Sequence, residues 1–567
     1  MLTRQDVLSR LTQTGQFELA QDHSLGYPIR VYRNAPPSMR AILESTRQFG
    51  DRTFLVYGDE TITFAEHFGK VAALAEFLMQ KGVRKGDRVA VGMRNYPEWM
   101  IGFWACQAIG AVVVALNAWW TGPELSYALD DSGASALIVD GERLERLAPE
   151  LDKWALKAVV VARRSGFADE GVAFSEVTRQ VPDRLPEAEV EPGDFATILY
   201  TSGTTGKPKG AVATHRNHVT NYMNTLLAGA VAKGMLGDFS ALNLKDVPQA
   251  GILQTFPFFH IGGMSGLYLA TGTGAKVALM YKWHPAEAVE LVARHRLNSV
   301  AGVPLVVRQL LEQARTTGAD VSSLVGIASG GASVPPDLIR QIGRQFEMKT
   351  SPSNGYGLTE TTSAVVTNSG ADYHAQPDSI GRPVVTADVK IVDETGNELG
   401  DDQIGELLVR GPNVIPGYWN NPEATELAFG GGWFRTGDLG YRDSRGFHYV
   451  VDRKKDVIIR GGENVYCAEV EAAILEHPQV KDVAVVGVPD AEYGEQVAAV
   501  IQVRDAARSD MLARELQTAL AGSLAQFKIP TAFRMTEADL PRTATGKVLK
   551  RELRSLFTEL PSDGKSA

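Results

Sequence analysis

Short apolar runs alternate with longer amphipathic stretches through most of this chain. The runs at 88–93, 136–139 and 158–161 are compact and rich in β-branched residues, which is typical of buried strands. Between such runs lie stretches of roughly 10–15 residues whose apolar positions have helical spacing. This alternation predicts βαβ units that build parallel sheets, and therefore an α/β fold class.

The stretch 99–122 carries no charged residue, and about 18 such residues are enough to span a membrane. Residues 99–109, however, have helical periodicity and end at Gly110, a natural helix C-cap. Residues 111–116 are β-branched and suit a buried strand. We therefore predict two short core elements here and no transmembrane segment.

The last third of the chain has a different pattern. Glycine turns and short strands beginning near residue 378 predict a small β-barrel. Beyond it, a helix at 468–476, strands at 483–488 and 496–503, and a helix at 513–527 predict a compact α+β unit of about 100 residues. The expected architecture is a large N-terminal domain of two βαβ-layered sheets plus a small β-barrel, followed by a smaller α+β C-terminal domain.

Composition narrows the function classes. The 567 residues exceed one ordinary domain, and 44% hydrophobic with 22% charged residues is a normal globular balance. The net charge of -10 argues against a non-specific nucleic-acid binder, so a phosphate ligand would require a local basic cluster. The two cysteines, Cys106 and Cys467, cannot form a disulfide framework, and no secretory signal is visible. Together these features predict a cytoplasmic protein.

A loop at 201–210 carries the strongest chemical signal. It contains three glycines, four hydroxyl side chains and two lysines. The backbone N–H groups of such a loop form a concavity for an anion, and Lys207 and Lys209 add positive charge. It is not a Walker A motif, because Pro208 stands where that motif needs Ser or Thr. The loop therefore predicts a polyphosphate site of another kind.

Residues 353–360 form a second chemical block. Glycines flank Tyr356, so its ring can stack on a flat base with backbone close on both sides. Asn354 can bond an adenine amino group, Thr359 can reach an α-phosphate, and Glu360 offers a carboxylate for Mg²⁺. Because ligands of α/β sheets bind at the carboxyl ends of strands, several glycine-rich strand ends point to one crevice. These strand ends carry Gly203, Gly302, Gly330, Gly331 and Gly355.

The order of these motifs closely resembles the class I adenylate-forming superfamily. That superfamily includes acyl- and aryl-CoA ligases, peptide-synthetase adenylation domains and beetle luciferases. The resemblance covers nearly the full length of the chain. The ordered stretches that carry it are 200–210, 251–263, 353–360, 432–440, 446–456 and 541–550.

The resemblance implies roles for the site residues. His260 would lie beside the substrate carboxylate, Asp438 would bind the ribose hydroxyls, and Lys547 would be the catalytic lysine. Thr359 and Glu360 complete the catalytic set, and Glu360 is the expected metal ligand. The implied nucleotide- and CoA-binding positions are Thr201, Ser202, Gly203, Thr204, Thr205, Gly206, Lys207, Lys209, Gly331, Ala332, Asn354, Gly355, Tyr356, Asp438, Arg453, Lys455, Gly461 and Gly462.

The resemblance also implies two mobile parts. Residues 1–453 would form the AMP-binding N-terminal domain, and residues 454–567 would form a C-terminal lid domain that turns at Lys455. The lid would first present Lys547 to the nucleotide. After rotation, the backbone of Gly461 and Gly462 would face the pantetheine arm of coenzyme A.

The implied activity is that of an ATP-dependent acyl-CoA ligase. A carboxylic acid and ATP give acyl-AMP and pyrophosphate, and CoA then gives acyl-CoA and AMP. The expected partners are thus a small-molecule carboxylic acid, ATP with Mg²⁺, and coenzyme A, with no nucleic acid. The sequence leaves open whether the protein contacts a membrane surface and whether it forms oligomers.

Other activities remain as alternatives. Loading of a carrier domain is disfavoured because only 20 residues follow Lys547, and an oxygenase of the luciferase kind is not excluded by the motifs. A non-catalytic nucleotide-binding scaffold would require loss of Lys547, Glu360 or Asp438, and all three are present.

The acyl pocket is expected among small and apolar side chains. Small residues leave space, which favours a medium or long fatty chain, or a bulky ring, over acetate. A fatty acid is the favoured substrate, and an aryl acid of the benzoate or cinnamate kind is the alternative. The expected lining is His260, Met264, Gly302, Val303, Gly331, Gly355, Thr362 and Ser363.

Overall fold

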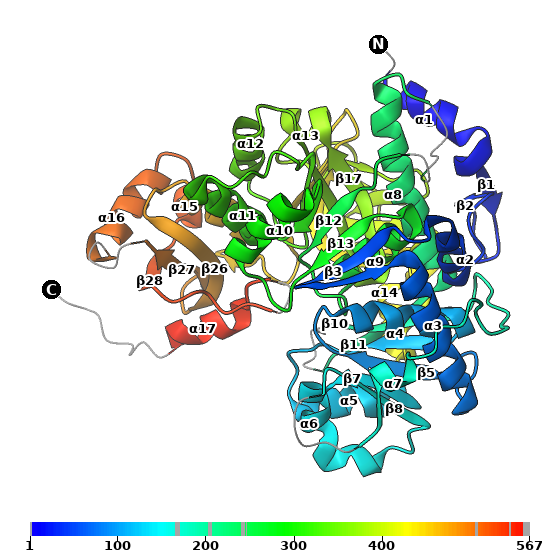
Figure 1. The fold of residues 1–567 in the computed structure, drawn as a ribbon. Helices are drawn as coiled ribbons and strands as arrows, with labels where there is room; N and C mark the ends of the chain where they lie inside the picture. The colour runs from blue at the N-terminus through cyan, green and yellow to red at the C-terminus, as the bar shows by residue number, and fades with distance from the viewer. Residues whose placement is uncertain are drawn as a thin grey trace. The chain divides into compact units, whose positions relative to one another are not determined.

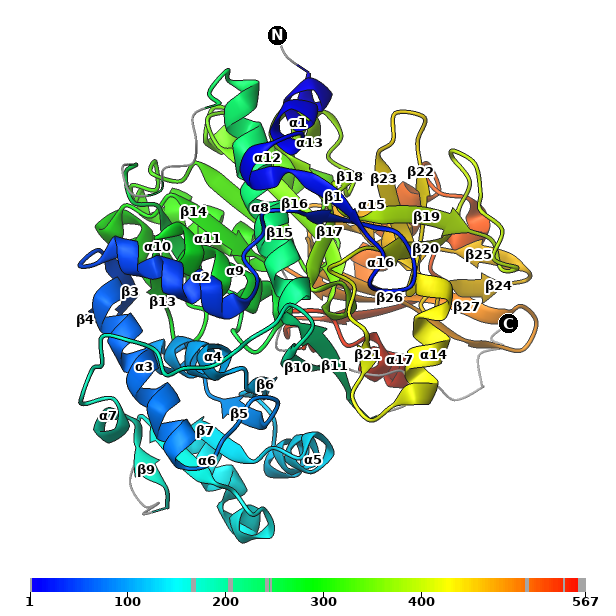
Figure 2. The same cartoon turned by 90° about the vertical axis from the view of Figure 1, so that its right-hand side faces the viewer.

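The computed structural model describes residues 3–164, 170–201, 207–239, 244, 247–504, 509–543 and 546–558. The chain divides into two compact units. The first comprises Met1–Val389 with Leu408–Arg435, and the second comprises Lys390–Leu407 with Thr436–Ala567. Figures 1 and 2 label the helices and strands of both units. The expected hinge at Lys455 stays a prediction.

An eight-stranded sheet organises the first half of the first unit (Figure 1). Its strand order is β21-β11-β10-β6-β5-β7-β8-β9. The strands from β10 to β9 run parallel, as the alternating pattern predicted, whereas β11 is antiparallel to both of its neighbours. The strands are β5 (Arg88–Gly92), β6 (Val112–Ala115), β7 (Ala136–Asp140), β8 (Ala158–Ala162), β9 (Val172–Ala173), β10 (Phe195–Thr201), β11 (Lys209–Thr214) and β21 (Gly417–Tyr418).

Helices cover both faces of this sheet, which explains why its strands are apolar without interruption. On one face, α4 (Pro97–Ile109) packs so closely that a Cβ at Gly102 would lie 3.5 Å from Ile138. On the other face, Leu137 shares a core cluster with residues of α5 (Gly122–Ser132) and α6 (Gly141–Leu147). Successive residues of β7 therefore point to opposite helical layers.

The uncharged stretch 99–122 contributes to this core. Helix α4 ends at Gly110, which has a φ of 68° and closes the last turn, and β6 follows directly. All of its residues from Trp99 to Ile109 are buried. Within the described part of the chain, no helix combines the length and the apolar character needed to cross a membrane.

A nine-stranded sheet forms the second half of the first unit. Its order is β18-β17-β16-β15-β14-β12-β13-β3-β4, with parallel strands from β16 to β3 and antiparallel edges. Its strands are β3 (Thr53–Tyr57), β4 (Glu60–Thr63), β12 (Gly251–Gln254), β13 (Lys276–Leu279), β14 (Ser299–Gly302), β15 (Gly326–Gly330), β16 (Ser351–Leu358), β17 (Ser363–Ser369) and β18 (Arg382–Pro383).

The remaining elements of the first unit surround these sheets. A small hairpin joins β1 (Leu19–Asp22) to β2 (Ile29–Tyr32). The α-helices are α1 (Arg4–Thr12), α2 (Met39–Ser45), α3 (Phe64–Gln80), α7 (Phe174–Val177), α8 (His215–Met235), α9 (Ile261–Thr273), α10 (Pro285–His295), α11 (Pro304–Thr317), α12 (Pro336–Gln345), α13 (Gly370–Ala375) and α14 (Pro422–Ala428). Single 3₁₀ turns are η1 (Gly15–Phe17), η2 (Thr46–Phe49), η3 (Ala148–Lys153), η4 (Thr359–Thr361) and η5 (Gly430–Gly432).

The second unit contains most of a four-stranded sheet and a second sheet with helices. The region expected to be a small barrel forms a sheet of order β19-β20-β22-β23. These strands are β19 (Asp388–Val392), β20 (Gly405–Arg410), β22 (Phe434–Arg442) and β23 (His448–Arg453). The second sheet contains β24 (Ile458–Arg460), β25 (Glu463–Val465), β26 (Val480–Asp490), β27 (Gly494–Val503) and β28 (Ala532–Thr536), with α15 (Cys467–Leu475), α16 (Ser509–Leu520), η7 (Gln526–Lys528) and α17 (Lys550–Thr558).

The bounds of three helices bear on the packing and on the site, and the end of α16 differs from the expected one. Helix α8 continues past residue 230 because its last turns pack on α1, where a Cβ at Gly234 would lie 2.5 Å from Val7. Helix α16 ends at Leu520 instead of residue 527, since the chain turns at Gly522. The terminal helix begins at Lys550, three residues after Lys547.

Candidate active site

Strands β10 and β11 bring the ends of the predicted phosphate loop together. Thr201 and Lys209 are paired across these strands at the carboxyl end of β10. The Lys209 ammonium lies 5.2 Å from the centre of the Tyr418 ring, and the Lys207 ammonium lies 5.5 Å from that of Tyr127. The five central loop residues predicted to bind phosphate lie outside the described residues; these are Ser202, Gly203, Thr204, Thr205 and Gly206.

Glycines allow β15 and β16 to approach closely at their carboxyl ends. Gly330 pairs with Gly355, and a Cβ at Gly330 would lie 3.1 Å from the Gly355 carbonyl oxygen. Gly331 then turns the chain with a φ of 76°, a conformation that glycine adopts without strain. The predicted adenine contacts therefore come from two neighbouring strand ends. They are Gly331, Ala332, Asn354, Gly355 and Tyr356.

Glu360 lies in η4, immediately after β16. Its side chain is buried, and one carboxylate oxygen accepts a 2.8 Å hydrogen bond from the Tyr418 hydroxyl. Thr359 begins the same turn, so both predicted catalytic residues of this block follow one strand end.

Strain and unsatisfied hydroxyls accompany these strand ends. Thr362 and Ser363 have φ values of 48° and 79°, left-handed conformations that cost a non-glycine residue about 1–2 kcal/mol. Among the described residues, the buried hydroxyls of Thr362 and Ser329 have no hydrogen-bond partner. Backbone strain of this kind clusters at functional sites.

His260 is the N-cap of α9. Its Nδ1 accepts a 3.2 Å hydrogen bond from the Gly262 N–H, so the neutral ring carries its proton on Nε2. Burial lowers the pKa of His260 to about 4, which keeps the ring neutral at physiological pH. The tight turn before α9 requires glycine, because a Cβ at Gly263 would lie 2.1 Å from the Pro257 carbonyl oxygen.

Phe256 connects the predicted adenine and acyl positions, and the sequence analysis did not single it out. A Cβ at either Gly262 or Gly331 would lie 3.6 Å from its ring. Ser363 approaches α9 as well, with its hydroxyl 3.4 Å from that of Ser265. The structure thus brings the start of α9, Gly331 and Ser363 together. The sequence signal that could have identified Phe256 is an aromatic residue directly before Pro257.

Two residues of the expected acyl-pocket lining, Met264 and Thr362, are completely buried.

Asp438 and Arg453 form an ion pair in the second unit. They face each other across the β22–β23 hairpin, with 3.2 Å between Arg453 Nε and Asp438 Oδ1. The Asp438 side chain is only 5% exposed. Asp438 lies within β22, directly after Gly437, whose φ is 71°.

Lys547 lies in a turn that precedes α17. Its N–H donates a 3.1 Å hydrogen bond to the Thr543 hydroxyl. The pKa of Lys547 is lowered to about 8, mainly by burial and then by the positive charges of Arg453 and Lys455, against the opposing effect of Asp438. The predicted catalytic lysine, ribose-binding aspartate and hinge residues therefore lie near one another within this unit.

Gly461 and Gly462 form the turn between β24 and β25. Their φ values are 61° and 89°, and the residues on either side, Arg460 and Glu463, are paired. A two-residue hairpin with positive φ at both positions favours glycine. The turn geometry alone accounts for these glycines, so their contact with CoA stays a prediction.

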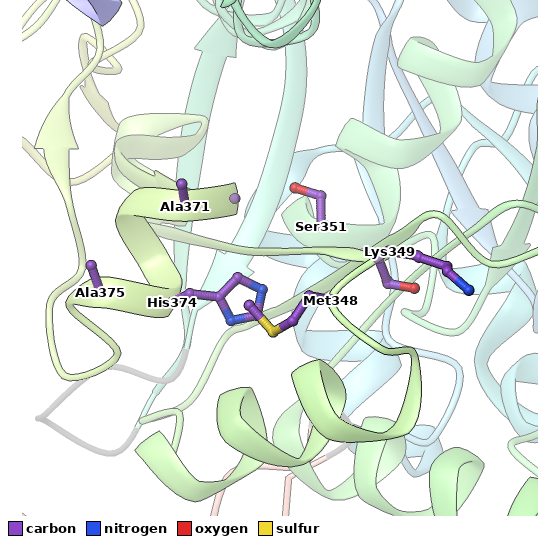
Figure 3. A pocket seen from close by; sticks show the side chains of 8 residues that line it. Met348, Lys349, Ser351, Ala371, His374 and Ala375 are labelled. Carbon is purple, nitrogen blue, oxygen red and sulfur yellow. The ribbon is translucent and has the colours of Figure 1, made fainter. Parts of the chain in front are cut away.

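An open hollow lies at the opposite end of β16 from the predicted site (Figure 3). It contains none of the predicted site residues. Its lining consists of Met348, Lys349, Thr350, Ser351, Gly370, Ala371, His374 and Ala375. These residues lie at the start of β16 and on α13, and ligands of α/β sheets bind at the other strand ends.

Both units gather cations and a buried carboxylate at the predicted nucleotide positions. In the first unit, the residues are Lys209 and Glu360, both in contact with Tyr418. In the second unit, they are Lys547 and Arg453 near Asp438. Cations suit phosphate oxygens, and a hard carboxylate suits a metal ion bound to them. The fold and these two sets of residues, one in each unit, define the class of an α/β protein that handles a phosphate-bearing substrate.

Comparison with known proteins identifies the family. The model of the AMP-binding enzyme family matches residues 42–419, and that of the AMP-binding enzyme C-terminal domain matches residues 469–547. The chain is 37% identical over 508 residues to a feruloyl-CoA synthase of Amycolatopsis sp, covering 89% of this chain and 96% of the relative. It is 31% identical over 558 residues to a long-chain-fatty-acid–CoA ligase of Bacillus subtilis, and the match covers 92% of this chain and 95% of the relative.

A solved structure agrees. The o-succinylbenzoate CoA synthetase of Bacillus subtilis, in complex with its acyl-adenylate intermediate, superposes with a TM-score of 0.76 at 30% identity. The match covers 94% of this chain and 99% of that one.

The chain belongs to the AMP-binding enzyme family. It is an AMP-forming acid–thiol ligase, which converts a carboxylic acid to its acyl- or aryl-CoA thioester through the acyl-AMP. Its substrates are a small-molecule acid, ATP and CoA, and it uses Mg²⁺. The buried Glu360 carboxylate fits this metal, which takes one or two protein carboxylates plus phosphate oxygens. Mg²⁺ bound to phosphate oxygens does not require a larger cluster of protein ligands. In the described ranges, no group of three or more His, Cys, Asp or Glu side chains could hold a metal ion.

Proposed function

We propose that the acid is aromatic, of the phenylpropenoic kind to which ferulate belongs. The observation that carries this proposal is the 37% identity to a feruloyl-CoA synthase, against 31% to a long-chain-fatty-acid–CoA ligase. The position of Phe256 beside Gly262 and Gly331 supports it, because an aromatic wall and small residues suit a flat ring. The fatty acid that the sequence analysis favoured becomes the second candidate.

Substrate binding is assigned to both units. In the first, Thr201, Lys207 and Lys209 hold the phosphates, and Tyr356 stacks on the adenine. His260 donates a hydrogen bond from Nε2 to the substrate carboxylate and adds no charge, since its ring is neutral. In the second, Asp438 accepts hydrogen bonds from the ribose hydroxyls.

The first chemical step needs no protein nucleophile. A carboxylate oxygen of the acid attacks the α-phosphorus of ATP, the bond from that phosphorus to the bridging oxygen breaks, and pyrophosphate leaves. Lys547 stabilises the developing charge as a cation, and Thr359 donates a hydrogen bond to the α-phosphate. Glu360 would hold Mg²⁺, which when bound neutralises charge on the phosphates.

The second step requires the lid domain, residues 454–567, to turn at Lys455. Rotation withdraws Lys547 and places the turn at Gly461 and Gly462 beside the pantetheine arm. The thiol loses its proton to solvent and attacks the acyl carbonyl, and the carbon–oxygen bond to AMP breaks. The products are the thioester and AMP.

A substrate screen tests the proposed acid. Pyrophosphate release is measured with ferulate, cinnamate, benzoate, hexanoate and palmitate at matched concentrations. We expect kcat/KM for ferulate or cinnamate to exceed that for palmitate by about tenfold or more. A preference for palmitate would replace the aromatic acid by the fatty acid, and release with no acid tried would contradict the whole assignment.

A further inference from the structure

Residues 413–419, the bridging segment, connect the two large sheets of the first unit at the predicted nucleotide site. Near its start, the Ile415 N–H donates a 2.9 Å hydrogen bond to the Glu360 carbonyl oxygen. Near its end, β21 adds to the edge of the eight-stranded sheet beside β11, the strand that begins at Lys209. Figure 2 shows β21 and β11 side by side. The segment therefore touches both the predicted metal ligand and the strand that leaves the phosphate loop.

Tyr418 makes both contacts through its side chain. Its hydroxyl donates a 2.8 Å hydrogen bond to Glu360 Oε1. The face of its ring lies 5.2 Å from the Lys209 ammonium, within the range of a cation–π interaction. The Tyr418 side chain therefore joins the Glu360 carboxylate to the Lys209 ammonium.

The backbone of Tyr418 is held on both sides. Its N–H donates a 2.9 Å hydrogen bond to the Thr425 hydroxyl, and the following Trp419 N–H donates a 2.7 Å bond to the Gly210 carbonyl oxygen. A Cβ at Gly417 would lie 2.4 Å from Thr425, so α14 packs directly against β21. A side chain on such a support has little freedom to move.

We propose that Tyr418 is a positioning residue for metal–nucleotide binding, which orients the Glu360 carboxylate and couples it to Lys209. The hydrogen bond from the Tyr418 hydroxyl fixes the position of Oε1. Loss of a partner that orients a metal ligand typically costs about 10–100-fold in metal affinity. This role rests on the proposed assignment of Glu360 as the Mg²⁺ ligand.

Two variants separate the contacts of Tyr418. Tyr418→Phe removes the hydroxyl and keeps the ring beneath Lys209, whereas Tyr418→Leu removes both. The probe is α,β-methylene-ATP, which cannot be cleaved at the bond that adenylation breaks, titrated calorimetrically with and without Mg²⁺. For Tyr418→Phe we expect the Mg²⁺-dependent gain in affinity to fall by about tenfold, with affinity in the absence of Mg²⁺ unchanged. Tyr418→Leu should lower both.

A matched control is Tyr281→Phe, which removes another tyrosine–glutamate hydrogen bond, the 2.9 Å bond to Glu142. It should leave the Mg²⁺ dependence at the wild-type value. In a Glu360→Gln background, Tyr418→Phe should have no further effect on that dependence.

The inference is overturned if Tyr418→Phe gains as much affinity for α,β-methylene-ATP from Mg²⁺ as the wild type does. It is also overturned if, in the double variant, the losses of this gain caused by Tyr418→Phe and by Glu360→Gln add up fully. Pyrophosphate release by the wild type with any acid separates this failure from a failure of the proposed function. An equal loss of affinity with and without Mg²⁺ in Tyr418→Phe would show a merely structural role and would also overturn it.

Discussion

Lys547 carries its positive charge only to a pH slightly above neutrality. Because its pKa is lowered to about 8, the protonated fraction falls as the pH rises through that value. We expect kcat/KM for ATP–pyrophosphate exchange to fall about tenfold per pH unit on the alkaline side. Lys547→Arg provides the comparison, since arginine stays charged throughout. An alkaline limb of the same position in that variant would show that another group titrates.

Local motifs single out residues that lie within distinctive stretches of the sequence, and the roles of these residues stay predictions. Lys547 and Asp438 lie within distinctive stretches, and both are found near the other residues predicted with them. Tyr418 was missed for a physical reason. The hydrogen bond from Tyr418 to Glu360 joins positions 58 residues apart, and no local spacing encodes such a contact.

Helix α17 is attached to α15 by a partly buried ion pair three residues after Lys547. Lys550 Nζ lies 2.7 Å from Glu471 Oε1, and the two side chains are 20% and 21% exposed. The Glu471 carboxylate also accepts the Val485 N–H at 2.8 Å, so removing Lys550 leaves a carboxylate that is fixed in place without its cation. We therefore expect Lys550→Met to lower the free energy of unfolding by about 2 kcal/mol, between the values for exposed and fully buried pairs, measured by urea denaturation. Adenylation should weaken with it, because the turn carrying Lys547 loses its anchor.

The control uses another ion pair on α15. Lys528 lies 2.8 Å from Glu469, whose side chain is 39% exposed. Lys528→Met should cost less than about 1 kcal/mol and leave adenylation intact. Equal effects of the two variants would mean that the Lys550–Glu471 pair has no special part in holding Lys547.

Hydrophobic periodicity predicts where strands and helices lie along the chain, but not which strands pair with one another in a sheet. The buried runs at β5, β7 and β8 and the helix α4 are found where the apolar pattern placed them. The position of β3 beside β13 has no counterpart in the local sequence, because the two strands are separated by most of the first unit. The same holds for β21 beside β11. Such pairings depend on how complete sheets pack, which is a property of the whole chain.

The whole molecule has to perform two half-reactions with one lid. Lys547→Ala should abolish formation of acyl-AMP while thioester formation from supplied acyl-AMP stays largely intact. Lys455→Pro should do the reverse, since proline restricts the backbone at the proposed pivot. Rates of both half-reactions are measured separately by pyrophosphate release and by thioester formation. Equal loss of both in Lys547→Ala would contradict this division of labour.

Domain organisation was predicted only in outline. The family models match residues 42–419 and 469–547, which leaves the proposed hinge between them. The division of the chain into two units instead places residues 390–407 and 436–453 with the C-terminal part. The reason is that β22 and β23 extend directly into the contacts around Asp452, which accepts the Ala468 N–H at 3.4 Å. A division that depends on tertiary contacts cannot be read from a periodic pattern.

The place of β21 also affects how the chain folds as it is made. Its partner β11 ends at Thr214, and about 200 further residues must be synthesised before Tyr418 emerges, on the order of 10–40 s at typical translation rates. During that time one edge of the eight-stranded sheet has no strand beside it. An uncovered edge invites pairing with other chains. Truncated forms that stop short of Gly417 should therefore aggregate during expression even though they contain every other strand of that sheet.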